Sequence, residues 1–180
     1  MTIQTYTVSV KALLIDVDRT WQKLLQRSRI PAATAIIGLS PPLVSSFVRL
    51  HTQEFPPSSD EVARRLEGSS QTVRYDRRLT LGLTLQDELL GATYGYPLSS
   101  SDAYIYGIAI KRNWRRSWAT VVLKQALFFS MHNAGFKHAH FQAMNNNKDT
   151  LNHARRVGAM TRLDIAEGDL SPSQGEPPRT

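Results

Sequence analysis

The sequence contains no cysteine among its 180 residues. This absence excludes disulfides, thiolate metal sites and a cysteine-linked acyl-enzyme. The sequence also has no apolar run near the ~18 residues that a membrane span needs. Its start, MTIQTYTVSVK, has neither the basic region nor the apolar region of a signal peptide. These absences predict a cytoplasmic protein with no membrane span.

Acidic residues are the minority charge, with 15 Asp and Glu against 22 Lys and Arg and a net charge of +7. A basic excess suits nucleic acid, anionic coenzyme A (CoA), an acidic carrier protein or an acidic peptide. The basic residues are scattered from Arg19 to Arg162, with one tight cluster at 111–116. Nucleic acid, which usually needs a basic stripe, is therefore the least favoured partner. The length and the 41% hydrophobic content predict one domain with a sizeable core.

A strand, a basic loop and a helix follow one another around residues 108–120, IAIKRNWRRSWAT. Residues 102–110 are rich in aromatic and β-branched side chains, which favours a strand. Apolar residues at three- and four-residue spacing predict a helix over 117–134. Gly135 is suited to end that helix in the left-handed conformation.

The junction between this strand and helix is suited to hold phosphate. The first amides of a helix lack partners within it, and the helix dipole adds positive potential there. Four cations flank these amides: Lys111, Arg112, Arg115 and Arg116. The alternative interpretation is a solvated basic turn that caps a helix.

The loop resembles the acyl-CoA loop of the GNAT superfamily of N-acyltransferases. In that family a strand ending in Val or Ile is followed, five residues later, by Arg or Gln and then by a helix that small residues open. Ile110 and Arg115 stand at the first two positions, while Trp118 and Thr120 replace the small residues.

A second segment, after a predicted strand at 137–144, resembles the family's Asn…Tyr…Gly-Phe pattern. Asn147 and Gly158 match it, but Ala154 stands where many members carry a tyrosine that protonates the departing thiolate, and Ala159 replaces the Phe. The resemblance covers about residues 79–163.

The resemblance implies an α/β (α+β) fold: a mixed, mostly antiparallel central sheet flanked by helices, with central strands that splay at the acyl-CoA site. The expected acyltransferase domain spans 31–165. It would include a buried strand at 33–39, helices over 41–53 and 58–66, and a hairpin of strands at 79–85 and 89–96. Residues 1–30 are expected to form an N-terminal extension with a strand at 5–10 and a short helix at 20–28, and 166–180 a disordered tail.

The implied activity is direct transfer of an acyl group, acetyl or longer, from acyl-CoA to a primary amine of a small molecule or peptide. The backbone amide of Ile108 would meet the thioester carbonyl. The remaining residues expected to hold acetyl-CoA or another acyl-CoA are Ile110, Arg115, Arg116, Ser117, Trp118, Ala119, Thr120 and Asn147.

The acceptor contacts are less sharply indicated. Tyr104 falls where histone-modifying members carry a catalytic glutamate, and it could position a water or the amine, or simply pack on the sheet. The predicted substrate-binding residues are Glu54, Phe55, Tyr94 and Tyr106, which could equally be surface or packing residues. His138 and His140 have metal-like spacing, but no third ligand is evident, so no metal is predicted.

Two alternatives stay open. The protein could take a long acyl chain, or an acyl-carrier-protein donor, and acylate an amine in a peptide or natural-product pathway. It could instead be a catalytically degenerate, GNAT-like module that binds acyl-CoA. A homodimer is compatible with each of these functions.

Overall fold

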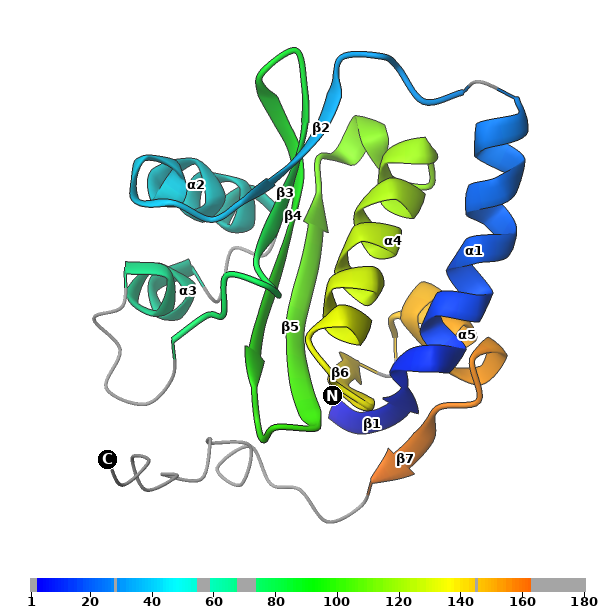
Figure 1. Ribbon diagram of the computed structural model, residues 1–180. Helices are drawn as coiled ribbons and strands as arrows, with labels where there is room; N and C mark the ends of the chain where they lie inside the picture. The colour runs from blue at the N-terminus through cyan, green and yellow to red at the C-terminus, as the bar shows by residue number, and fades with distance from the viewer. Residues whose placement is uncertain (1–2, 28, 55–58, 68–73, 145, 163–180) are drawn as a thin grey trace, which may run out of the picture.

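The structure is a computed structural model that describes residues 3–27, 29–54, 59–67, 74–144 and 146–162 (Figure 1). Phe55, Ser58 and the predicted tail at 166–180 lie outside the described residues. Seven strands form one sheet in the order β2-β3-β4-β5-β6-β1-β7. Their bounds are β1 (Ile3–Ser9), β2 (Thr34–Gly38), β3 (Leu81–Leu85), β4 (Glu88–Pro97), β5 (Asp102–Ile110), β6 (His138–Met144) and β7 (Met160–Arg162).

Helices cover both faces of the sheet, as Figure 1 shows. One face carries α1 (Val10–Gln26), α4 (Trp118–Asn133) and α5 (Lys148–Arg156), and the other carries α2 (Val44–Glu54) and α3 (Ser59–Glu67). Only β5 and β6 pair in parallel, and the other neighbouring strands are antiparallel. The predicted mixed, mostly antiparallel sheet flanked by helices is confirmed. Within the described residues, no helix is long and apolar enough to cross a membrane.

Local sequence explains the hairpin and the end of the long helix. Gln86 and Asp87 form the two-residue turn between β3 and β4, with φ angles of 50° and 65°. Two consecutive left-handed residues match the right-handed twist of the flanking strands. At the end of α4, Gly135 has φ 85°, and the amide of Phe136 donates to the carbonyl of Met131 at 3.1 Å. This is the helix ending predicted for Gly135.

The N-terminal segment is built into the sheet and core. Strand β1 lies between β6 and β7, and α1 packs against α4. The predicted helix at 20–28 is helical up to Gln26, but its predicted start is wrong, because α1 begins at Val10 and runs for 17 residues. Aspartates such as Asp16 and Asp18 are typical of turns, but Asp16 lies within the helix and accepts from Arg156 Nε of α5 at 2.6 Å. A partner 140 residues away makes an acidic residue favourable at that helical position.

Strand β2 also differs from its prediction. It pairs only with β3 at one edge of the sheet, and the side chains of Ala35 and Ile36 are exposed. The apolar run at 33–39 suggested a buried strand, whereas an edge position leaves one side of the strand uncovered.

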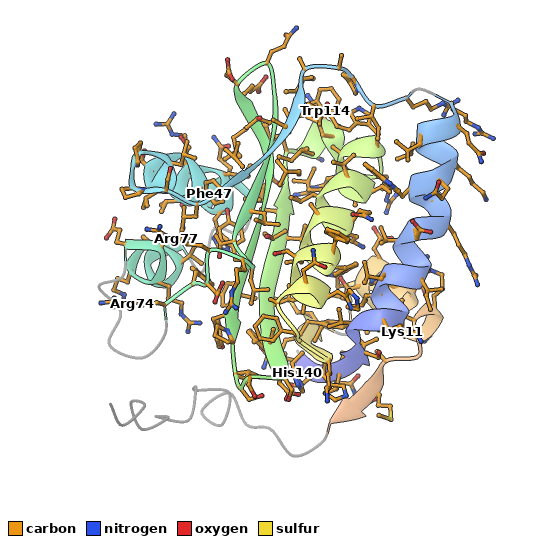
Figure 2. The ribbon with its side chains drawn as sticks, in the orientation of Figure 1. Lys11, Phe47, Arg74, Arg77, Trp114 and His140 are labelled. Atoms are coloured by element: carbon orange, nitrogen blue, oxygen red, sulfur yellow. The ribbon has the colours of Figure 1, made fainter. Side chains whose placement is uncertain are left out.

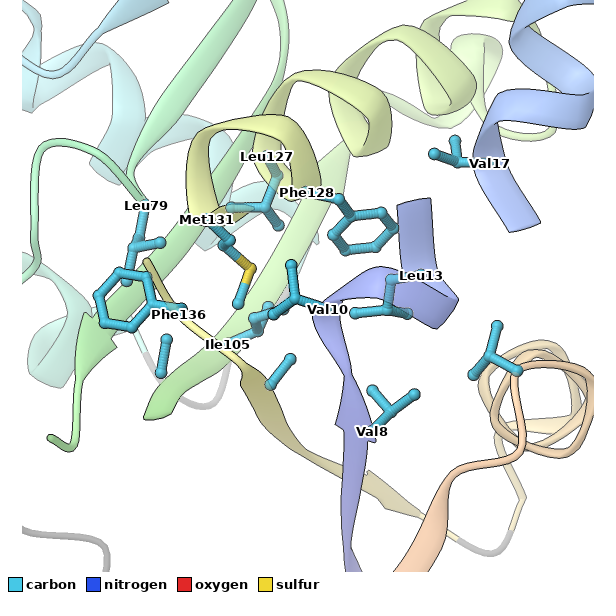
Figure 3. Packing of buried hydrophobic residues seen from close by; sticks show 13 residues of the cluster. Val8, Val10, Leu13, Val17, Leu79, Ile105, Leu127, Phe128, Met131 and Phe136 are labelled. Carbon is cyan, nitrogen blue, oxygen red and sulfur yellow. The ribbon is translucent and has the colours of Figure 1, made fainter. Parts of the chain in front are cut away.

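The main apolar core lies between the sheet and helices α1 and α4 (Figure 3). Val8 of β1 and Leu13 of α1 pack there with Leu127, Phe128 and Met131 of α4. The N-terminal elements β1 and α1 therefore complete the core that packs against β5.

We expect Leu13→Ala to lower the free energy of unfolding by about 2–5 kcal/mol, because a buried leucine is replaced by a cavity. Leu13 is 2% exposed, whereas Leu25, on the same helix, is 48% exposed. The matched control Leu25→Ala should therefore change stability by less than about 0.5 kcal/mol. Urea unfolding of both variants measures the difference. Equal effects would contradict the docking of α1 on α4.

Candidate functional site

Strand β5 separates from β6 halfway along its length. The parallel pairing joins Asp102–Ile105 to His138–Phe141 and then stops, while β5 continues to Ile110 along β4. The register between β4 and β5 shifts at the same point, so that Tyr106 is an extra residue in β5. A bulge of this kind bends its strand and re-aims the residues beyond it. The described chain offers no strand partner to this side of β5 beyond Ile105, which matches the predicted splay.

The register places two predicted site residues on the open edge. Lys111 N donates to Leu90 O at 2.9 Å, and these two residues flank the opposed pair Ile110 and Gly91. In an antiparallel ladder, hydrogen-bonded and non-hydrogen-bonded pairs alternate. Because Lys111 and Leu90 are bonded, the neighbouring pair of Ile110 and Gly91 is a non-hydrogen-bonded pair. The alternation along β5 therefore turns the amides and carbonyls of Ile108 and Ile110 away from β4. The backbone groups of Ile108 and the amide of Ile110 can pair with an added extended chain, whereas the Ile110 carbonyl accepts from Arg115 Nε.

The first turn of α4 faces the end of this edge. Ser117 caps the helix, with its Oγ accepting from Ala119 N at 3.2 Å and donating to Trp114 O at 2.6 Å. Within the described residues, no acceptor bonds the amides of Arg116, Ser117 and Trp118. Arg116 is left-handed, with φ 57°. Thr120 Oγ1 is buried and finds no hydrogen-bond partner in this part of the chain. The junction thus offers several unused donors at a helix N-terminus.

Carboxylates from other elements pair with the arginines of the loop. Arg115 binds Glu54, the last residue of α2, and its Nε donates to Ile110 O at 3.2 Å. Arg116 pairs with Asp149, in the first turn of α5, at 2.7 Å. Arg116 and Asp149 are both exposed, so this ion pair can exchange with an incoming anion at small cost. The Glu54 side chain is only 10% exposed, so displacing it from Arg115 costs more. The structure brings predicted residues Glu54 and Arg115 together.

Trp118 packs beneath the loop. Its ring lies 5.6 Å from that of Trp114 in a T-shaped arrangement, and both rings pack against a core cluster that includes Leu83, Ile110 and Leu123. The indole in place of a small residue is thus part of the core, while the backbone amide of Trp118 stays at the helix start.

The predicted acceptor residues separate into two groups. Tyr94 is fully buried and donates to the carbonyl of Phe47 at 2.8 Å, and Tyr104 is 5% exposed with its ring 5.2 Å from that of Tyr96. Tyr106 is half-buried on the face that α2 and α3 cover. Of these three tyrosines, Tyr106 is therefore the one with a partly accessible ring beside the open edge.

Other nearby groups offer little acid or base chemistry at neutral pH. Burial lowers the pKa of His51, whose ring lies 5.9 Å from that of Tyr106, to about 4. Asn147 caps α5, its Oδ1 accepting from Thr150 N at 3.1 Å. Ala154 is 1% exposed and packs against the sheet.

Sequence reasoning missed a polar clamp, formed by Asp102, His140 and Thr7, in the stretch where β5 and β6 pair. His140 is 2% exposed, and its Nε2 lies 3.0 Å from Asp102 Oδ1 while its Nδ1 lies 2.9 Å from Thr7 Oγ1. The clamp joins β5, β6 and β1 across the sheet. Since both ring nitrogens of His140 are engaged, the metal-like spacing with His138 has a structural explanation. No group of three or more metal-binding side chains occurs among the described residues.

Comparison with known proteins rests on structure alone. No protein-family model matches the sequence, and a search of curated proteins found no match. Among solved structures, a GCN5-related N-acetyltransferase from Sphaerobacter thermophilus has a TM-score of 0.61 at 14% identity, over 89% of this chain and 48% of that one. An aminoglycoside N-acetyltransferase solved with CoA has a TM-score of 0.58 at 16% identity, over 74% of this chain and 92% of that one.

The chain has the GNAT fold. A functionally unknown conserved protein from Staphylococcus epidermidis has a TM-score of 0.62 at 11% identity, over 89% of this chain and 57% of that one. The chain spans about half the length of this protein and of the Sphaerobacter enzyme. The predicted fold resemblance is confirmed, whereas the site residues stay predictions.

Asp102 allows a test of the clamp. Burial by itself would raise the pKa of Asp102, but hydrogen bonds from Ser101, His140 and Ser99 outweigh it and hold the pKa well below its usual range. A carboxyl with a depressed pKa adds stability that is present above its unfolded pKa of about 3.9 and is lost as the pH falls below it.

We therefore expect Asp102→Asn to lower the free energy of unfolding by about 1–3 kcal/mol near pH 5. The difference from the parent should shrink as the pH is lowered from about 5 to about 2. Urea titrations across this range measure it, with Asp87→Asn in the exposed β3–β4 turn as the control. A difference that does not change with pH would assign the effect of Asp102 to packing instead of charge.

Proposed function

We propose that this chain is an N-acyltransferase that moves an acyl group from acyl-CoA directly to a primary amine. One observation carries the proposal: the open edge of β5, with the backbone groups of Ile108 and Ile110 turned outward, ends at the capped start of α4. An extended donor arm and its phosphates need these two features side by side.

The residues present fit the two ends of a CoA molecule. The arm would pair with Ile108 and Ile110 as an added strand. The pyrophosphate would take the amides of Arg116, Ser117 and Trp118, with the guanidinium groups of Arg115 and Arg116 as charge partners. Thr120 Oγ1 is a further unused group in the same turn.

Acyl-CoA supplies an activated thioester, and the amine takes its acyl group as the carbon–sulfur bond breaks. The amide of Ile108 would donate to the thioester oxygen, where charge develops. Tyr104 and Tyr106 would position the amine or a water that accepts the amine's proton. Since Ala154 cannot donate a proton, solvent would protonate the leaving thiolate.

The finer parts of the prediction belong to this proposal too. Acetyl and longer acyl donors, small-molecule and peptide acceptors, an acyl-carrier-protein donor, a homodimer and a cytoplasmic location all stay predictions. The second candidate is a module that binds acyl-CoA without turnover. The buried Tyr94 and Tyr104 and the missing acid at Ala154 favour it, because they leave few groups to move protons.

If CoA displaces Asp149 from Arg116, neutralising these two residues should change CoA affinity in different directions. Arg116→Gln should weaken CoA binding by about tenfold, because a charge-assisted contact is lost. Asp149→Asn should leave binding equal or tighter, because Arg116 no longer has to leave a carboxylate. Isothermal titration with CoA measures both, and Arg19→Gln, an exposed residue of α1, is the control for net charge. Weaker binding in Asp149→Asn would contradict the exchange.

The absence of cysteine allows a clean test of turnover. A thiol reagent detects released CoA without background from the protein, because the chain has no thiol of its own. Native mass spectrometry with free CoA, acetyl-CoA and longer acyl-CoAs should first identify the preferred donor. That donor should then release thiol only when an amine acceptor is present. Binding without release over a broad amine panel would favour the binding module, and no binding to any CoA would overturn both candidates.

A further inference from the structure

An arginine-lined groove lies on the α2–α3 side of the sheet. It has a volume of about 750 Å³ and runs between the start of α2, the end of α3 and residues 74–77. Apolar side chains form its floor, including Leu39, Val44, Val48, Leu66 and Tyr75. Four arginines line it, Arg49, Arg65, Arg74 and Arg77, against one acidic residue of the described lining, Glu67. Figure 2 shows Arg74 and Arg77 beside α3.

The charge of this groove is unbalanced. Arg49, Arg74 and Arg77 are exposed, and none makes an ion pair or side-chain hydrogen bond within the described residues. Neighbouring Arg78, by contrast, pairs with Asp76 at 2.7 Å. Unpaired cations around a low-dielectric floor focus a positive potential on whatever enters. The groove therefore complements an apolar molecule that carries negative charge.

An aromatic cluster links the groove to the open edge of β5. The guanidinium of Arg65 lies 5.4 Å from the ring centre of Tyr106, and the Tyr75 ring lies 6.3 Å from it. Tyr106 is the extra residue of β5, two positions before Ile108. The Tyr75 hydroxyl is buried and has no hydrogen-bond partner in the described part of the chain. A molecule in the groove is thus one aromatic layer away from the strand that would hold the acyl group.

We infer that this groove selects the acceptor: an amine with an apolar body and at least one oxyanion, carboxylate or phosphate, held by Arg49, Arg74 and Arg77. The inference rests on the proposed function, whose acceptor class it narrows. Guanidinium groups form bidentate hydrogen bonds with both carboxylates and phosphates. The volume suits a small molecule, because ligand pockets usually measure about 300–1,000 Å³.

Direct binding tests the groove without requiring catalysis. The full chain is titrated with two matched pairs of probes: Leu-Glu-Glu against Leu-Gln-Gln, and O-phosphotyramine against tyramine. In at least one pair the anionic probe should bind about tenfold tighter than its neutral partner, because charge-assisted contacts to arginine are added. The pair that shows the difference identifies carboxylate or phosphate as the oxyanion. No preference in either pair would overturn the inference.

Variants assign the preference to these arginines. Arg74→Gln combined with Arg77→Gln, and separately Arg49→Gln, should reduce the preference for the anionic probe by about tenfold or more. Arg27→Gln, an exposed position just beyond α1, should retain it. Thermal unfolding checks that each variant is folded. A preference that survives in the double variant and in Arg49→Gln would overturn the assignment.

Turnover separates this inference from the proposed function. With the preferred acyl-CoA, the ratio of kcat/KM for the anionic amine to that for its neutral partner should exceed about ten and fall in the groove variants. Equal ratios, with acyl transfer intact, would overturn the groove inference and leave the proposed function standing. No turnover of any amine would overturn the proposed function and with it the acceptor role, although the binding titrations still decide whether the groove binds anions.

Discussion

The separation of β5 from β6 after Ile105 is the constraint on which the candidate site depends. A parallel pair continued to Ile110 would use up the amides that now face outward. The extra residue Tyr106 bends β5, and β4 continues to satisfy the other edge of the strand. Within the paired stretch, Asp102, His140 and Thr7 connect three neighbouring strands through side chains. Hydrogen bonds to the Asp102 carboxylate hold the paired stretch of β5 and β6. Ile105, the last paired residue of β5, packs in the main apolar core, so polar and apolar contacts together fix where the strands part.

The two faces of the sheet have different physical roles around this opening. On the α1–α4 side, closely packed aliphatic and aromatic side chains hold β5 and carry the helix that presents the basic loop. On the α2–α3 side, the core combines aliphatic side chains with a group of tyrosines, whose rings run from the buried Tyr94 to the half-buried Tyr106. Such a face combines rigid apolar area with hydroxyl groups. It can thus wall a binding site and still contribute to the stability of the sheet.

Features set by neighbouring residues could be predicted from the sequence, whereas features set by distant contacts could not. The β3–β4 hairpin, the strand–loop–helix around 108–120 and the helix end at Gly135 follow from turn residues, spacing and capping. The insertion of β1 between β6 and β7 has no local signal, because any alternating strand could fill that place. The length of α1 was missed since Asp16 is favourable there only through Arg156. The groove arginines come from α2, α3 and residues 74–77, which only the tertiary fold brings together.

The net charge of +7 has two different consequences in the fold. At the loop, Arg115 and Arg116 are paired with Glu54 and Asp149. An anion that binds to these arginines must therefore displace a carboxylate from each. At Arg116 one exposed ion pair replaces another, and at Arg115 the anion displaces the largely buried Glu54. The ion pairs therefore add little net free energy, and the unpaired helix amides must supply most of the affinity. In the groove, Arg74 and Arg77 have no such partners within the described chain, so their potential acts before any contact forms. Long-range attraction would therefore act most strongly at the groove, and the loop would select by geometry.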